Sequence, residues 1–115
     1  MVSAPGRAVT HLKVIYVGGL DCAPCTTWKK KYKAEWLASP HYTRVTWIEI
    51  EPTRLKEAYQ ARHWPRELHA VLDGLPRKSG TPRFLIVRDG EVVSNEFGVS
   101  KWLVTLADLE KILGE

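Results

Sequence analysis

Two cysteines, Cys22 and Cys25, are the residues of this chain whose type and spacing could do chemistry. They lie in the stretch GGLDCAPCTTWKKKY, residues 18–32, and the 115-residue chain has no other cysteine. Two cysteines at this spacing are able to bond with little backbone movement, or to supply two of the four ligands of a zinc ion. The pair therefore indicates redox exchange or metal binding, and a third alternative is a buried pair without chemistry.

The neighbouring sequence places Cys22 at the start of a helix. The apolar, β-branched run HLKVIYVGG (residues 11–19) predicts a buried strand that ends at a Gly pair. After it, one cysteine and three aromatic residues recur at helical spacing: Cys25, Trp28, Tyr32 and Trp36. They predict a helix over residues 23–37. Unpaired N–H groups and the helix dipole lower the pKa of a cysteine at a helix start, so Cys22 is the candidate nucleophile and Cys25 the candidate resolving cysteine.

The remainder of the sequence predicts further strands and helices. Residues 43–50 (TRVTWIEI) predict a strand, and residues 53–74 predict two short helices broken at Trp64-Pro65. Residues 83–97 predict a β-hairpin with a type I′ turn at Asp89-Gly90. Thr105, three residues before Asp108, resembles a capping box that opens a last helix. This order predicts an α/β fold in which a mixed sheet of about four strands carries helices on both faces.

The length, charge and hydropathy of the chain limit the other functions that it could have. We expect residues 1–10 to be a flexible N-terminal segment and residues 11–115 to be one domain. The net charge is +4, and the one cluster of lysines consists of Lys29, Lys30, Lys31 and Lys33. On a helix these four would cover the outer face, so we expect no nucleic-acid partner. The apolar runs are shorter than the roughly 20 residues that span a bilayer, so we expect no membrane insertion. No signal-peptide pattern precedes the domain, and a mature periplasmic chain or a cytoplasmic protein would both fit.

A metal site has little support in the sequence. Zinc would need two of the four histidines, which are His11, His41, His63 and His69. These show no close pairing, and no second cysteine pair exists, so we expect no metal and keep zinc as an alternative. Pro82 directly precedes a predicted strand and by itself indicates only a strand-entry proline.

The motifs together resemble the thioredoxin superfamily over about residues 11–114. They are the strand LKVIYV, the motif CAPC, the helix with Trp28, GTP before a strand, the turn DGE, and Gly98 ahead of the final helix. The resemblance implies a thioredoxin-like fold and a thiol–disulfide oxidoreductase that acts on protein thiols and disulfides. It implies no bound cofactor and an upstream redox protein as electron source. We expect a monomer.

The resemblance also implies site roles. Cys22 would attack and Cys25 would resolve, Pro82 would be a cis-proline against the disulfide, and Thr81 would pair with the substrate backbone. We expect the two residues between the cysteines, Ala23 and Pro24, to contact substrate as well.

Two residues depart from the family pattern and are expected to modulate the pair. Asp21 stands where thioredoxin has Trp, and its charge would raise the pKa of the thiolate, which predicts a reducing pair. Tyr16 stands where the family has a buried acid, and Glu49 or Glu51 is a candidate to replace it.

Other interpretations remain open. Trp64 or Trp102 is a candidate for a hydrophobic lip near the cysteines. The alternative functions are a redox-sensing or redox-inert binding module and a glutathione-linked enzyme.

Overall fold

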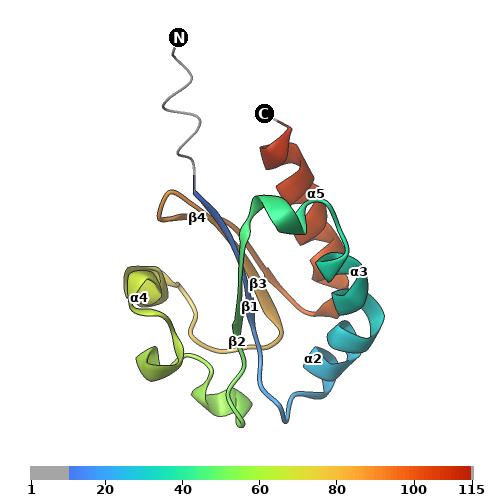
Figure 1. The fold of residues 1–115 in the computed structure, drawn as a ribbon. Coiled ribbons are helices and arrows are strands. Elements are labelled where there is room, and N and C mark those ends of the chain that lie inside the picture. Colours follow the sequence, from blue (N-terminus) through green and yellow to red (C-terminus); the bar gives the residue numbers. More distant parts are fainter. Residues whose placement is uncertain (1–10, 115) are drawn as a thin grey trace.

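A four-stranded mixed sheet forms the centre of the fold in the computed structural model, which describes residues 11–114 (Figure 1). The strands are β1 (Leu12–Val17), β2 (Thr46–Ile50), β3 (Arg83–Arg88) and β4 (Glu91–Phe97), in the spatial order β2-β1-β3-β4. β1 pairs in parallel with β2 and antiparallel with β3, and β3 pairs antiparallel with β4. The α/β fold class and the mixed sheet are thus confirmed, whereas the N-terminal segment 1–10 lies outside the described residues.

The inner strands β1 and β3 are buried on both faces, which explains why their sequences are continuous apolar runs and do not alternate. Asp89 and Gly90 join β3 to β4 with φ values of 50° and 88°. These positive angles at both central residues are those of the predicted type I′ turn.

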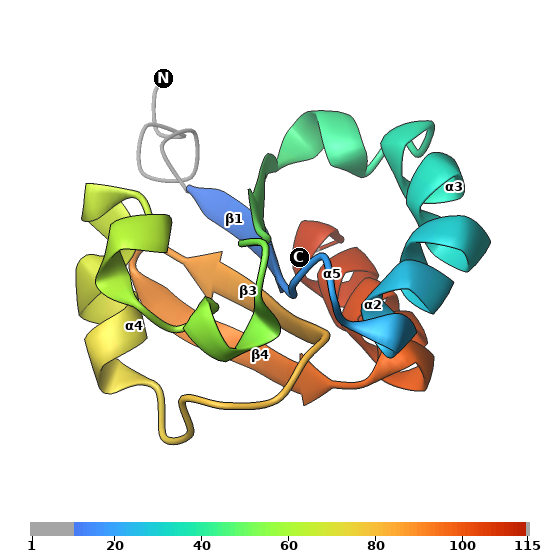
Figure 2. The same cartoon turned by 90° about the horizontal axis from the view of Figure 1, so that it is seen from below.

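One face of the sheet is covered by the predicted helix 23–37 and by α5 (Trp102–Leu113), as Figures 1 and 2 show. The first of these consists of α2 (Ala23–Trp28), a π-helical turn (Lys29–Lys33) and α3 (Ala34–Leu37). The aromatic stripe of this helix packs against α5 and the sheet, with Trp28 and Trp36 each 5.3 Å from Trp102 between ring centroids. The apolar spacing in the sequence therefore identified the buried side of the helix.

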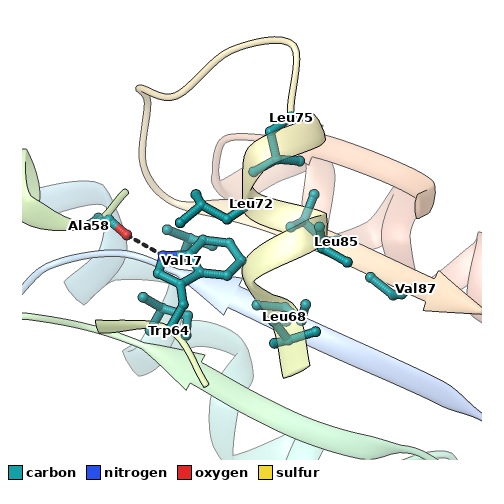
Figure 3. Packing of buried hydrophobic residues seen from close by; sticks show 11 residues of the cluster. Val17, Ala58, Trp64, Leu68, Leu72, Leu75, Leu85 and Val87 are labelled. Carbon is teal, nitrogen blue, oxygen red and sulfur yellow. Dashed lines mark hydrogen bonds between the residues drawn. The ribbon is translucent and has the colours of Figure 1, made fainter. Parts of the chain in front are cut away.

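The other face carries α4 (His69–Gly74), and here one prediction was wrong. Only the second of the two expected helices forms. The first is replaced by 3₁₀ turns at Leu55–Glu57 and Ala61–His63, and a third 3₁₀ turn at Arg66–Leu68 takes the first residues of the second, which becomes α-helical at His69. Gln60 and Trp64 take extended backbone angles, which turns the Trp64 side chain into the core beside Leu68 and Leu72 (Figure 3). Its indole N–H donates to the Ala58 carbonyl over 2.7 Å.

The expected start of the last helix was also wrong. α5 begins at Trp102, after a 3₁₀ turn at Val99–Lys101. The Thr105 side chain is buried and donates to the Lys101 carbonyl, and Asp108 accepts from Ser94 of β4. Neither side chain caps the helix, because burial of Trp102 starts it one turn earlier.

β2 begins at Thr46, since a 3₁₀ turn at Tyr42–Arg44 takes the first residues of the predicted strand. Across residues 11–114, no helix is both long enough and apolar enough to cross a membrane.

Candidate active site

The strand directions bring three chain segments to one edge of the sheet. β1 and β2 are parallel, so the residues after each of them, 18–22 and 51–55, lie at the same edge. β3 is antiparallel to β1, so the residues before it, Thr81 and Pro82, arrive at that edge as well. Backbone hydrogen bonds fasten the first two segments together, from Gly18 N to Ile50 O (2.8 Å) and from Leu20 N to Pro52 O (3.0 Å).

Cys22 and Cys25 form a disulfide at this edge, with their Cα atoms 5.2 Å apart. Cys22 is the N-cap residue of α2, and its Sγ accepts a hydrogen bond from the Cys25 backbone N–H at 3.2 Å. Pro24 occupies the first turn, where a missing N–H costs no helical hydrogen bond. Both sulfur residues are buried, whereas Ala23 and Pro24 between them are exposed.

Thr81 lies directly against the disulfide. Its hydroxyl donates to Cys22 Sγ over 3.2 Å, although 59 positions separate the two residues in the chain. The Thr81-Pro82 peptide bond is cis, and Pro82 is buried. The structure thus brings Thr81 and the cysteines together, and Pro82 lies between Thr81 and the first residue of β3.

The segment before Thr81 is held by buried polar contacts from the sheet and from the 3₁₀ region. Tyr59 Oη donates to the Gly80 carbonyl at 2.6 Å. Arg83, fully buried at the start of β3, donates to the Arg77 carbonyl and to Asn95 Oδ1. The contacts to Gly80 and Arg77 hold the segment that presents Thr81, and no periodic pattern in the sequence indicates them.

Asp21, expected to modulate the pair, has a defined structural contact. Its Oδ1 accepts a hydrogen bond from the Leu55 backbone N–H at 2.7 Å. Gly19 lies against the same residue, since a Cβ on Gly19 would come within 2.5 Å of Leu55 Cα. The cysteine loop and the segment after β2 are therefore closely packed, and a side chain at position 19 would separate them.

Tyr16 lies close to Cys25 and belongs to a group of hydrogen-bonded side chains that extends toward the surface. Its hydroxyl donates to Glu51 Oε2 at 2.6 Å, and Lys29 Nζ donates to the same oxygen at 2.7 Å. Burial raises the pKa of the Tyr16 phenol, and the Glu51 hydrogen bond raises it further. Lys29 is therefore more than an outward-facing charge, and Lys33 likewise pairs with Glu49.

The expected tryptophan lip is wrong. Trp64 and Trp102 are 4% and 1% exposed, on opposite faces of the sheet, because both fill the core. The apolar side chains exposed beside the disulfide are instead Leu20, 60% exposed, and Leu55, 38% exposed. Leu20 lies in the loop before the cysteines and has no periodic signal, and the sequence had assigned Leu55 to a helix that does not form.

No support for a metal centre comes from the part of the chain that is described. Among residues 11–114, no group of three or more His, Cys, Asp or Glu side chains could hold a metal ion. His41 contacts Glu110, His63 contacts Glu57, and His69 contacts backbone carbonyls.

Comparison with known proteins gives a fold and no close relative. No family profile matches the sequence, and no curated protein matches it. Among solved structures, the chain is similar to the oxidised thioredoxin from Plasmodium falciparum, studied in solution, with a TM-score of 0.55 and 17% sequence identity. The match covers 89% of this chain and 81% of that one. The protein has a thioredoxin-like fold with a Cys-X-X-Cys disulfide at the start of its first helix.

Proposed function

We propose that this protein is a thiol–disulfide oxidoreductase that exchanges disulfides with protein partners. The observation that carries the proposal is the position of the Cys22–Cys25 disulfide at the start of α2, with Cys22 Sγ accepting from Cys25 N–H and from Thr81 Oγ1. Hydrogen bonds to a sulfur favour its thiolate form, which is the form that attacks disulfides.

Cys22 is the nucleophile in this proposal. Its thiolate attacks a disulfide of the partner, a mixed disulfide forms, and Cys25 attacks Cys22 Sγ to release the reduced partner. Thr81 then receives the partner's backbone, and the exposed Ala23 and Pro24 face it together with Leu20. An upstream thiol protein returns the pair to the dithiol form.

Reduction of insulin by a recycling thiol tests the activity. We expect the wild-type protein to accelerate insulin reduction and Cys22→Ser to abolish the acceleration. A wild-type protein without turnover would refute the oxidoreductase and leave a redox-sensing or inert binding module, particularly if Cys22→Ser bound the same partner equally well.

The identity of the partner is approached by trapping. Cys25→Ser leaves the mixed disulfide without its resolving thiol, so we expect covalent complexes that a reductant dissolves. The double variant Cys22→Ser, Cys25→Ser is the matched control and should trap nothing.

The direction of electron flow follows from the potential of the pair. Asp21 beside Cys22 disfavours the thiolate, and a less stable thiolate makes the pair more reducing. We expect a reducing pair, and a potential as high as about −120 mV would contradict this.

A further inference from the structure

Cys25 Sγ is fully buried, and this creates a problem for the reaction proposed above. When Cys25 attacks the mixed disulfide, its thiol proton must leave, although a core position offers no water to accept it. A group that accepts this proton has to be within the core and has to connect to the surface.

Tyr16 Oη is the polar atom in the right place. An ideal Cβ on Gly18 would come within 2.2 Å of Tyr16 Oη and within 2.9 Å of Cys25 Sγ. Both atoms therefore border the same small space, which exists because residue 18 has no side chain. Tyr16 stacks on Trp28 with ring centroids 4.8 Å apart, and this packing holds the hydroxyl at that position.

The Tyr16 hydroxyl is hydrogen-bonded to an ion pair near the surface. It donates to Glu51 Oε2 at 2.6 Å, and the Glu51 side chain is 15% exposed. Lys29 Nζ, 2.7 Å from the same oxygen, holds the carboxylate in place. The three side chains come from β1, from the residue after β2 and from the π-helical turn, so only the tertiary fold assembles them.

We infer that Tyr16 and Glu51 form a proton relay for Cys25, in which Glu51 is the terminal base and Tyr16 passes the proton. The inference rests on the proposed function and assigns two further catalytic residues to it. Lys29 is a positioning residue that orients the carboxylate.

The S–H bond of Cys25 breaks and its proton moves to Tyr16 Oη, while the Tyr16 phenol proton moves to Glu51 Oε2. The Cys25 Sγ–Cys22 Sγ bond forms, the bond between Cys22 and the partner's sulfur breaks, and the electron pair leaves with the partner's thiolate. Glu51 then gives its proton to water, and the partner's thiolate takes one. The partner disulfide is reduced by two electrons and the cysteine pair is oxidised.

The charged groups around the relay are few. Lys29 faces Glu51 from the helix, and Glu49 lies two residues earlier on β2, paired with Lys33 at 3.0 Å. Glu49 and Lys33 thus form a second Glu–Lys pair between β2 and the π-helical turn, without the hydrogen bond to Tyr16. They provide a matched control.

Rapid mixing of the reduced protein with equimolar dithiobis(nitrobenzoate) separates the two chemical steps. Attack by Cys22 releases the first nitrothiobenzoate and resolution by Cys25 releases the second, so Cys25→Ser should show the first release alone. We expect Tyr16→Phe and Glu51→Gln to slow the second release by at least about tenfold, the lower range of general acid–base effects. The first release should stay within about twofold of wild type, as expected for a step that the relay does not serve.

The controls are Glu49→Gln, which removes a nearby charge, and Tyr32→Phe, which removes a phenol from the π-helical turn that carries Lys29. Both should leave the two phases unchanged. The pH profile distinguishes a relay from a structural effect. Without Glu51 the thiol must ionise by itself, so the second phase of Glu51→Gln should depend more steeply on pH than that of wild type.

Second phases within about twofold of wild type in both Tyr16→Phe and Glu51→Gln would overturn the relay, as would equal slowing in Glu49→Gln. If Tyr16→Phe fails to fold, Glu51→Gln alone decides, because glutamine keeps an acceptor for the Tyr16 hydroxyl. The assay uses a small aromatic disulfide. Wild-type rates of the second release in Tyr16→Phe and Glu51→Gln would refute the relay without affecting the result of insulin reduction. A protein that does not reduce insulin would refute the proposed function, and it can still release both nitrothiobenzoate groups in this assay.

Discussion

Removal of the Thr81 hydroxyl tests how the fold activates Cys22. Thr81→Val keeps the shape of the side chain and deletes the donor that lies 3.2 Å from Cys22 Sγ. A hydrogen bond to a charged group contributes about 1.5–3 kcal/mol, and sulfur is a weak acceptor, so the lower end applies. Since one pKa unit corresponds to about 1.4 kcal/mol, we expect the pKa of the Cys22 thiol to rise by about one unit. The sign is positive because the lost hydrogen bond favoured the thiolate.

The rate of alkylation by iodoacetamide as a function of pH measures this pKa in the reduced protein. Cys25→Ser serves as the background, so that one thiol reports. Thr81→Ser should restore the wild-type curve because it keeps the hydroxyl. Thr27→Val is the matched control, since its hydroxyl donates to the Ala23 carbonyl and touches no sulfur. If Thr81→Val left the pKa of Cys22 within about 0.3 unit of wild type, the hydrogen bond would not contribute to activation.

Three other predictions concern the surroundings of the disulfide. Gly18→Ala should destabilise the oxidised protein by about 1–3 kcal/mol in urea unfolding, because its Cβ would clash with Tyr16 Oη and Cys25 Sγ; unchanged stability would contradict that packing. Burial raises the pKa of Tyr16, so the folded state keeps this proton while the unfolded chain loses it above about pH 10. The free energy of unfolding should therefore fall above that pH, by up to about 1.4 kcal/mol per pH unit from Tyr16 alone, and Tyr16→Phe should lack this contribution. Parallel curves of stability against pH for wild type and Tyr16→Phe would refute this. Asp21→Asn keeps an acceptor for the Leu55 N–H and removes a negative charge, so the pKa of Cys22 should decrease; an increase would show that the carboxylate acts mainly through that hydrogen bond.

The sequence predicted the elements whose signal is local. The spacing of Trp28, Tyr32 and Trp36 gave the helix and its buried side, and Asp89-Gly90 gave the hairpin turn. The sequence failed where burial decided the backbone. Trp64 turned a predicted helix into 3₁₀ turns, and Trp102 started the last helix earlier than the expected cap at Thr105.

By itself the sequence determined that Cys22 and Cys25 lie at a helix start, since strand, turn and helix there follow from neighbouring residues. Only the tertiary structure decided what surrounds them. Thr81 reaches Cys22 because β3 runs antiparallel to β1, and Glu51 reaches Tyr16 because β2 runs parallel to it. The turn at Asp89-Gly90 encodes the antiparallel pairing of β3 with β4, but the pairing of β1 with β2 and with β3 is a property of the assembled sheet that no local pattern encodes.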